Sequence, residues 1–265
     1  MPADFLRWTL PTSQLGKTVH VYDCLDSTNS LALALGNDPV HHGIVVLARE
    51  QTAGRGQYGR SWHAPAGSSV LMSVVLFPPL ELRRPALLTA WAAVSVCETI
   101  HKLTNLQAAI KWPNDVLIAG KKVCGILIEQ RTTGHADFPL ATVAGIGLNV
   151  TQSAAMFAEA GLPLAASLAS ASTTAVDHET ATLELVRQLD LHYVRMQAGD
   201  VATLEFHWKA RLGLLDRMVV AAGVNQQVCG RLRDVTFAGL DLEMATGEMV
   251  RLLPESVRQL QLAEE

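Results

Sequence analysis

Three strand-length runs of apolar residues follow one another in the middle of the chain, with no helical pattern between them. They cover residues 110–118, 122–130 and 140–150. The first two are joined only by residues 119–121, a connection short enough for a hairpin, with Gly120 available for a positive φ. Strands joined in this way pair antiparallel, so the order of elements predicts an α+β fold rather than alternating strand–helix–strand units.

The other elements fit a mixed β-sheet flanked by helices. Apolar residues that recur every three or four positions predict several helices. The expected strands are 19–22, 44–48 and 69–77, and the expected helices are 30–35, 85–103, 180–197 and 201–212.

The pattern changes after about residue 214. Short strand candidates at 218–221, 227–235, 240–244 and 248–253 are separated by glycines. Short strands separated by glycines predict a small C-terminal β-barrel. We therefore expect a main domain over residues 1–213 and a β domain over 214–265.

Composition excludes several classes of protein. The formal net charge is −4 and the pI is about 6.1, so there is no global basic field for nucleic acid or an anionic membrane. There is no long apolar segment and no secretory signal pattern, and the four cysteines show no CxxC spacing. We expect a cytoplasmic protein whose Cys97 and Cys124 are core residues.

The segment most suggestive of chemistry is residues 51–67, which has four glycines and two arginines between two predicted strands. Glycines let the backbone approach a ligand, and Arg55 and Arg60 can bind phosphate or carboxylate. A solvated surface loop is the alternative, but irregular loops of this length are uncommon unless they are functional or disordered. The segment lacks the ending of a Walker loop, and no helix follows it as in a dinucleotide-binding fold.

Four shorter motifs are ambiguous one by one. Asp115 in Lys-Trp-Pro-Asn-Asp (111–115) is a ligand for magnesium or an acid in a turn. Lys122 shares a strand face with Cys124 by simple alternation, so it either enters a pocket or is an ordinary hairpin lysine. The glycines of Gly-Ile-Gly-Leu-Asn (145–149) admit a ligand or a close-packed element. Ser27 or Thr28 is a helix N-cap, a role compatible with binding a ligand.

The order of these motifs resembles that of the biotin–protein ligases. The series is D-S-T-N, Q-x-A-G-R-G-x-x-G-R-x-W, K-W-P-N-D, K-x-x-G-I-L-x-E and G-x-G-x-N over roughly residues 20 to 150. The resemblance implies an enzyme that forms biotinyl-5'-AMP from biotin and ATP and then transfers biotin to a lysine of a biotin carboxyl carrier domain. It also implies a C-terminal SH3-like module, ATP with Mg as substrate, biotin as the second substrate, and no prosthetic group.

The resemblance also assigns residues. It makes Arg55, Lys122 and Asp115 catalytic, with Arg55 spanning the biotin carboxylate and the α-phosphate, and Asp115 as the candidate for magnesium. The biotin-binding residues are Ser27, Thr28, Asn29, Gln51, Gly54, Arg55, Gly56, Gln57, Lys122 and Gly125. The ATP-binding residues are Arg55, Arg60, Trp62, Lys111, Asn114, Asp115 and Asn149.

Two departures from the family pattern matter. The loop has Gln57 where the family often has arginine, which predicts some leakage of the adenylate. About 18 residues precede the first predicted strand, too few for the N-terminal DNA-binding domain of some family members, so we expect a ligase without operator binding. We also expect a sheet edge to pair in a homodimer or to dock the carrier. The alternatives are a lipoate–protein ligase of the same fold and a non-catalytic biotin-binding regulator.

Overall fold

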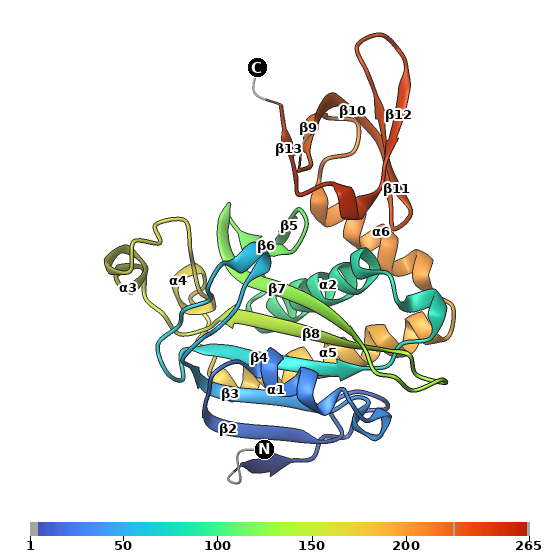
Figure 1. The fold of residues 1–265 in the computed structure, drawn as a ribbon. Coiled ribbons are helices and arrows are strands. Elements are labelled where there is room, and N and C mark those ends of the chain that lie inside the picture. Colours follow the sequence, from blue (N-terminus) through green and yellow to red (C-terminus); the bar gives the residue numbers. More distant parts are fainter. Residues whose placement is uncertain (1–4, 225, 264–265) are drawn as a thin grey trace.

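The computed structural model describes residues 5–224 and 226–263, and it contains two sheets (Figure 1). The first sheet has eight strands. They are β1 Leu6–Trp8, β2 Val19–Leu25, β3 Val45–Gln51, β4 Ser69–Leu76, β5 Ala109–Lys111, β6 Asp115–Ile118, β7 Lys121–Thr132 and β8 Leu140–Asn149. The helices are α1 Thr28–Leu35, α2 Pro85–Thr104, α3 Ala154–Glu159, α4 Leu168–Ala171, α5 His178–Gln197 and α6 Val201–Leu212.

The strand order of the large sheet is β1-β2-β3-β4-β8-β7-β6-β5. Every neighbouring pair is antiparallel except β2 and β3, which are parallel and are connected through α1. The α+β class and the mixed sheet are therefore confirmed. The one strand–helix–strand unit is the part that the hairpin-based expectation did not include.

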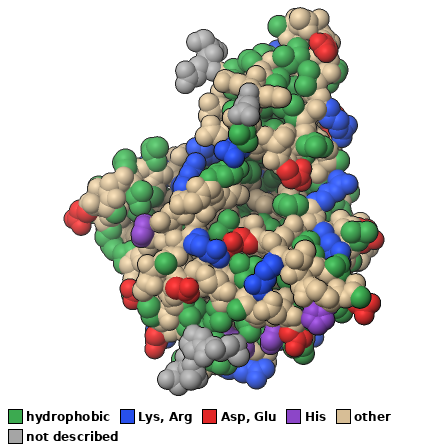
Figure 2. Space-filling model, in the orientation of Figure 1, with side chains coloured by type: hydrophobic (Ala, Val, Ile, Leu, Met, Phe, Trp, Pro, Cys, Tyr) green, Lys and Arg blue, Asp and Glu red, His purple; other side chains and the backbone are tan. Residues whose placement is uncertain are grey.

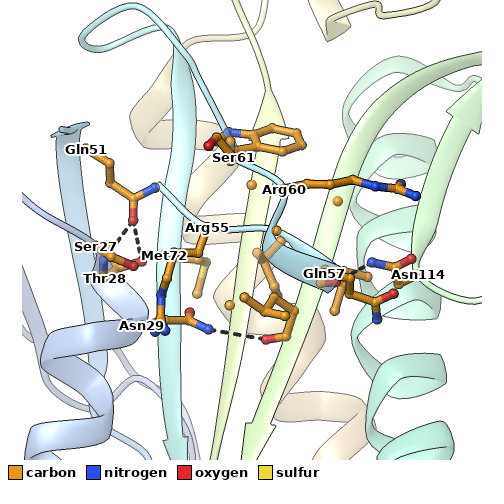
Figure 3. A pocket seen from close by; sticks show the side chains of 18 of the residues that line it. Ser27, Thr28, Asn29, Gln51, Arg55, Gln57, Arg60, Ser61, Met72 and Asn114 are labelled. Atoms are coloured by element: carbon orange, nitrogen blue, oxygen red, sulfur yellow. Dashed lines mark hydrogen bonds between the residues drawn. The ribbon is translucent and has the colours of Figure 1, made fainter. Parts of the chain in front are cut away.

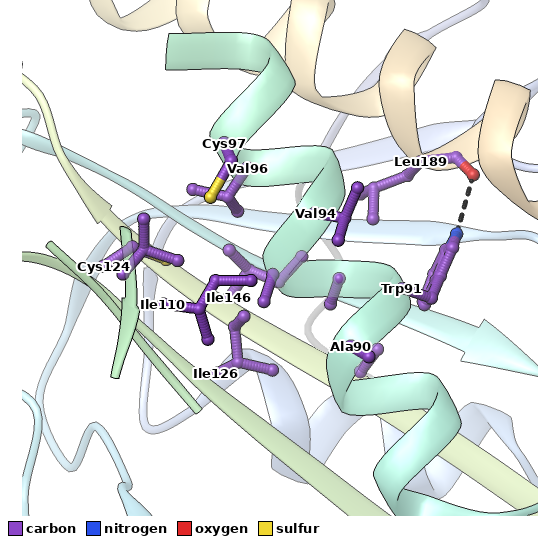
Figure 4. Close-up of a cluster of buried hydrophobic side chains, with 14 of the residues drawn as sticks. Ala90, Trp91, Val94, Val96, Cys97, Ile110, Cys124, Ile126, Ile146 and Leu189 are labelled. Carbon is purple, nitrogen blue, oxygen red and sulfur yellow. Dashed lines mark hydrogen bonds between the residues drawn. The ribbon is translucent and has the colours of Figure 1, made fainter. Parts of the chain in front are cut away.

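Helices cover both faces of this sheet, with α1 on one face and α2 and α5 on the other (Figure 1). Strand β3 shows why, because Val45 and Leu47 belong to the core under α2 and α5, whereas Val46 and Ala48 belong to a smaller core under α1. The fully buried α2 residue Trp91 packs in the larger core and donates a hydrogen bond to the Leu189 carbonyl at 3.0 Å (Figure 4).

The two central cysteines lie in this larger core, as expected. Cys97 of α2 and Cys124 of β7 are both buried, free thiols in the cluster that Figure 4 shows. Burial raises the pKa of the Cys97 thiol to about 12 and that of Cys124 well above its ordinary value. Thiols protonated in this way are poor nucleophiles and metal ligands, so these two residues are packing residues.

The predicted single strand over residues 110–118 is wrong. The structure divides it into β5 and β6, which pair antiparallel across Trp112, Pro113 and Asn114. Pro113 has no N–H for a sheet ladder, and the Trp112–Pro113 peptide bond is cis. The tight turn places Asp115 at the start of β6, opposite Lys111.

The expectation that Lys122 shares a face with Cys124 is also wrong. The pairing of β6 with β7 shifts register between Val116 and Leu117, so one extra residue of β7 lies between Lys122 and Cys124. Such a bulge reverses the simple alternation of side chains. Lys122 therefore faces a cavity while Cys124 enters the core.

The second sheet follows α6 and has five antiparallel strands in the order β12-β11-β10-β9-β13. The strands are β9 Met218–Ala222, β10 Gln227–Thr236, β11 Gly239–Glu243, β12 Met249–Leu252 and β13 Gln259–Leu262. No pairing closes β12 onto β13 among the described residues. The predicted strands are all present, and β13 is an addition to them.

Aromatic residues connect the second sheet to the main body. The Trp112 indole donates a hydrogen bond to the Val257 carbonyl at 2.8 Å, and its ring lies 5.7 Å from that of Trp208 on α6. The Trp208 ring in turn stacks on Phe237 of the second sheet at 5.0 Å. Trp112 is thus a core residue that joins the β5–β6 turn to the C-terminal sheet.

The surface carries charges of both signs. In the orientation of Figure 1, lysine and arginine side chains are interspersed with aspartate and glutamate rather than gathered into one basic patch (Figure 2). In the described part of the chain, no helix is long and apolar enough to cross a membrane.

Candidate functional site

A cavity lies over β4, β7 and β8, between the first turn of α1 and the glycine- and arginine-rich loop that follows β3 (Figure 3). It gathers segments that are far apart in the sequence. The lining residues are Ser27, Thr28, Asn29, Gln51, Arg55, Gly56, Gln57, Arg60, Ser61, Trp62, Met72, Asn114, Asp115, Lys122, Gly125, Ile126, Leu127, Gly145, Ile146 and Gly147.

One end of the cavity consists of buried, neutral polar groups. Ser27 occupies the N-cap position of α1, but its side chain makes no capping hydrogen bond. The Gln51 side chain takes that role, because its Oε1 accepts the Thr28 backbone N–H at 2.7 Å and the Thr28 hydroxyl at 3.1 Å. The Ser27 hydroxyl and the Gln51 NH₂ group therefore remain available at the wall of the cavity.

Asn29 extends this hydrogen-bonded group across the sheet. Its Oδ1 lies 2.5 Å from Ser73 Oγ, and its Nδ2 donates to Glu129 Oε2 at 2.7 Å. A Cβ on Gly145 would lie 2.0 Å from Asn29 Oδ1, so only glycine leaves room for this side chain. The bare face of Gly145 therefore makes room for the Asn29 side chain.

The cavity also contains two cations, each paired with an acid, with Arg55 beside the neutral group and Lys122 farther along. Lys122 Nζ lies 2.7 Å from Asp115 Oδ1, and Arg55 Nη2 lies 2.8 Å from Glu129 Oε2. The side chains of Lys122 and Arg55 are 36% and 39% exposed, so both cations can reach a ligand. Asn114 is fixed beside them, because its Nδ2 donates to the Ile126 carbonyl at 2.6 Å.

The Trp62 indole lies on the floor of the cavity. A Cβ on Gly147 would lie 2.6 Å from the Trp62 ring, and one on Gly125 would lie 2.9 Å from it. Lys122 Nζ lies 5.6 Å from the ring centroid, and the buried indole Nε1 has no hydrogen-bond partner within residues 5–224 and 226–263. With the ring in this position the cavity has a free volume of about 100 Å³, below the roughly 300–1,000 Å³ typical of small-molecule sites.

The tip of the loop reaches the second sheet. Tyr58 has a φ of 57° and is exposed, and the Arg258 guanidinium lies 4.7 Å from its ring centroid. Within the loop, the backbones of Arg55 and Ser61 pair in an isolated antiparallel β-bridge. A second, open cavity runs along this loop and ends at Glu129.

Most of the residues predicted from the sequence meet in this one cavity. Three do not line it: Gly54, Lys111 and Asn149. Gly54 packs against the backbone of Trp62, because a Cβ there would be 2.3 Å from the Trp62 carbonyl oxygen. Lys111 is exposed on β5.

Asn149 is 5% exposed, and protein groups use its amide. Its Nδ2 donates to the Ala166 carbonyl at 3.0 Å, and its Oδ1 accepts from Ser69 Oγ at 3.3 Å.

No role was predicted from the sequence for several residues of the site, although Ile126, Leu127, Glu129 and Ile146 stand within the quoted motifs. Their contact with the cavity depends on strand pairing. They are Ser61, Met72, Ile126, Leu127 and Ile146 in the lining, and Ser73 and Glu129 in the hydrogen-bonded network. In the described ranges, no group of three or more His, Cys, Asp or Glu side chains is arranged to hold a metal ion.

Comparison with known proteins agrees with this geometry. Residues 21–149 match the biotin/lipoate A/B protein ligase family. The bifunctional ligase/repressor BirA of Bacillus subtilis is 32% identical over 234 residues, which are 88% of this chain and 69% of that protein. The biotin–[acetyl-CoA-carboxylase] ligase of Paracoccus denitrificans is 36% identical over 204 residues, 74% of this chain and 81% of that protein.

Solved structures have the same fold. A biotin protein ligase from Aquifex aeolicus, in complex with biotin and ATP, has a TM-score of 0.76 at 23% identity and covers 92% of this chain and 99% of that one. A biotin protein ligase from Leishmania major, in complex with biotinyl-5-AMP, has a TM-score of 0.56 at 21% identity, with 88% and 98% of the two chains covered.

Proposed function

Because this chain belongs to the biotin–protein ligases, within the biotin/lipoate A/B protein ligase family, we propose that its cavity binds biotin and ATP side by side and forms biotinyl-5'-AMP. One observation carries the proposal: a single cavity combines buried neutral hydrogen-bonding groups with two half-exposed cations. A neutral ureido ring suits the first end, and the carboxylate and α-phosphate suit the second.

In the first half-reaction an oxygen of the biotin carboxylate attacks the α-phosphorus of ATP, and pyrophosphate leaves. Two anions must approach each other, so the step needs positive charge between them. Arg55 spans the carboxylate and the α-phosphate, since a guanidinium offers several N–H donors in one plane. Lys122 leaves Asp115 and binds the biotin carboxylate, whose negative charge it stabilises.

In the second half-reaction the amine of a carrier lysine attacks the carbonyl carbon of the mixed anhydride, and AMP leaves. Lys122 then stabilises the developing charge on the carbonyl oxygen. The proposed acceptor is a biotin carboxyl carrier domain, and the name of the Paracoccus relative gives acetyl-CoA carboxylase as the acceptor of that protein. Asp115, freed from Lys122, is the carboxylate that would hold magnesium together with the ATP phosphates.

The remaining assignments follow from the same placement. Ser27, Thr28, Asn29 and Gln51 form the ureido end, and Arg60, Asn114 and Trp62 the nucleotide end. The nucleotide roles of Lys111 and Asn149 stay predictions, because neither side chain lines the cavity.

Ligand entry requires the loop to move. The Trp62 ring occupies space over Gly125 and Gly147 that a ligand needs, and the free volume is too small for biotin with ATP. We propose that residues 54–67 open to admit the ligands and close over the adenylate, which excludes water from a hydrolysable anhydride.

We also propose that residues 1–213 form the catalytic domain and that residues 214–265 form an SH3-like module. The five antiparallel strands after α6 support this division. The cytoplasm is the proposed compartment, which suits four cysteines that are all free thiols.

The experiment that tests the function is exchange of labelled pyrophosphate into ATP, with biotin or lipoate added in parallel. Exchange that requires biotin is the expected result. Exchange only with lipoate would move the chain to the lipoate ligases, and no exchange by the folded protein with either acid would leave a non-catalytic binding role.

A further inference from the structure

Glu129 is a charged residue of the site that has no role in the proposed reaction. It lies on β7, at one end of the open cavity beside the loop, with 26% of its side chain exposed. Its Oε2 accepts hydrogen bonds from Arg55 Nη2 at 2.8 Å and from Asn29 Nδ2 at 2.7 Å. One carboxylate oxygen thus joins the arginine of the loop to the buried polar end of the cavity.

The carboxylate is itself held from the rigid side. Asn29 is 4% exposed, and it is fixed by Ser73 on β4, by the Leu127 carbonyl at 3.4 Å and by the bare backbone of Gly145. Each of these groups lies in the first turn of α1 or in a central strand. Glu129 therefore has a defined position that does not depend on the loop.

The position of Arg55, in contrast, depends on the loop. It lies in an irregular loop, its side chain is 39% exposed, and Glu129 is the acid within ion-pair distance of it among the described residues. The contact uses one nitrogen of a group with five N–H donors, so the rest of the guanidinium remains free for other anions. A carboxylate at this point also lowers the affinity of Arg55 for those anions, so the pairing costs binding unless it fixes the guanidinium in a useful direction.

We propose that Glu129 is a positioning residue, which orients the Arg55 guanidinium toward the carboxylate and α-phosphate from a fixed point on β7. This inference rests on the proposed function. Asn29 and Ser73 complete the support, so the ordered neutral groups of the cavity set the direction of the cation that the loop carries beside them. A positioned group of this kind acts without reorganisation when the anions arrive.

The test uses Glu129→Gln. An amide oxygen in the place of Oε2 can still accept from Asn29 and Arg55, so the variant removes the charge and leaves the packing. We expect kcat/KM for biotin in pyrophosphate exchange to fall about fivefold, because the variant removes the ionic attraction that holds the part-exposed guanidinium and leaves only a hydrogen bond to an amide oxygen. The unfolding temperature should stay unchanged.

A double-mutant cycle separates positioning from a general effect on the cavity. In an Arg55→Ala background, Glu129→Gln should have no further effect on the Kd for biotin, measured by calorimetry so that slow turnover does not matter. Asp23→Ala is the matched control, because it breaks an exposed arginine–acid pair with Arg49 at 3.3 Å, outside the cavity, and should leave kcat/KM within twofold.

Three results would overturn the role of Glu129: unchanged exchange in Glu129→Gln, faster exchange in it, or an equal loss with and without Arg55. The wild-type chain in the same assay tests the proposed function separately. If it shows no biotin-dependent exchange, the ligase function fails. If it does, and the cycle is additive, only the positioning role fails.

Discussion

The neutral polar side chains of the cavity are almost fully buried, whereas its two cations are more than a third exposed. Ser27, Thr28 and Asn29 are 3%, 3% and 4% exposed, and Arg55 and Lys122 are 39% and 36% exposed. The neutral groups are fixed by a helix turn and central strands, whereas Arg55 lies on a loop and Lys122 on a hairpin strand. Groups that recognise a neutral ring can be fixed before the ligand binds. The two cations, in contrast, are paired with acids and must leave them to bind the anionic groups of the ligands.

The largest expected effect is on the cationic end. Lys122→Ala should lower biotin-dependent pyrophosphate exchange by about 10²–10³-fold, the loss typical for removal of one group that stabilises developing charge. Lys121→Ala, at the exposed neighbouring position of β7, is the control and should retain normal exchange. Comparable losses in both variants would show that the hairpin and not the Lys122 charge is responsible.

Two glycine substitutions compare the rigidity of the two ends directly. In Gly145→Ala the new methyl would meet Asn29, which is held on several sides, so we expect a loss of about 1–3 kcal/mol in the free energy of unfolding. In Gly147→Ala it would meet Trp62, which lies on the loop and can move.

We expect the Gly147→Ala loss to stay under about 1 kcal/mol, with impaired exchange instead. Urea unfolding of both variants measures the difference. Equal destabilisation would contradict the contrast between a fixed and a movable end.

A smaller effect is expected from Thr28→Val at the neutral end. It removes the hydroxyl between Gln51 and Ser73 but keeps the shape, and should raise the KM for biotin about tenfold with little change in kcat. Thr180→Val removes a comparable hydroxyl from the first turn of α5, bonded to Asp177 at 2.8 Å outside the cavity, and should leave this KM unchanged. A fall in kcat alone would argue against a role in ground-state binding.

The smallest expected effect concerns Gln57, a half-buried residue where the loop lines the cavity. Gln57→Arg restores the charge that relatives often carry, and we expect labelling of unrelated proteins in trans to fall about two- to threefold, since an exposed ionic contact contributes under about 1 kcal/mol. Streptavidin blotting of a mixture with bystander proteins measures this. Unchanged labelling would mean that Gln57 does not limit retention of the adenylate.

The sequence was informative where a signal is local. The helix over residues 201–212 is found at those bounds as α6, and the strands of the large sheet were placed within a few residues, except for β1 and the divided 110–118 segment. The motif order also located the cavity, because each motif lies where a strand or helix begins or ends.

What failed depends on pairing across the sheet. The face of Lys122 was wrong because a bulge is a property of two paired strands and not of one. Glu129, although part of a quoted motif, and Ser73 were given no role, because their partner Asn29 lies 100 and 44 residues away in the chain. The nucleotide role of Asn149 stays a prediction, and the protein partners of its amide come from separate segments that no local pattern connects to it.

The hydrogen bond from Trp112 to Val257 bears on how this protein can be shortened. A chain ending at residue 213 would follow the predicted domain boundary, yet it would leave the Trp112 indole without its acceptor and uncover Trp208 where Phe237 now stacks on it. The same turn leads into Asp115. Truncation there would therefore yield an aggregation-prone fragment with a displaced acid, and a division of the gene at this linker would require both pieces to be produced together.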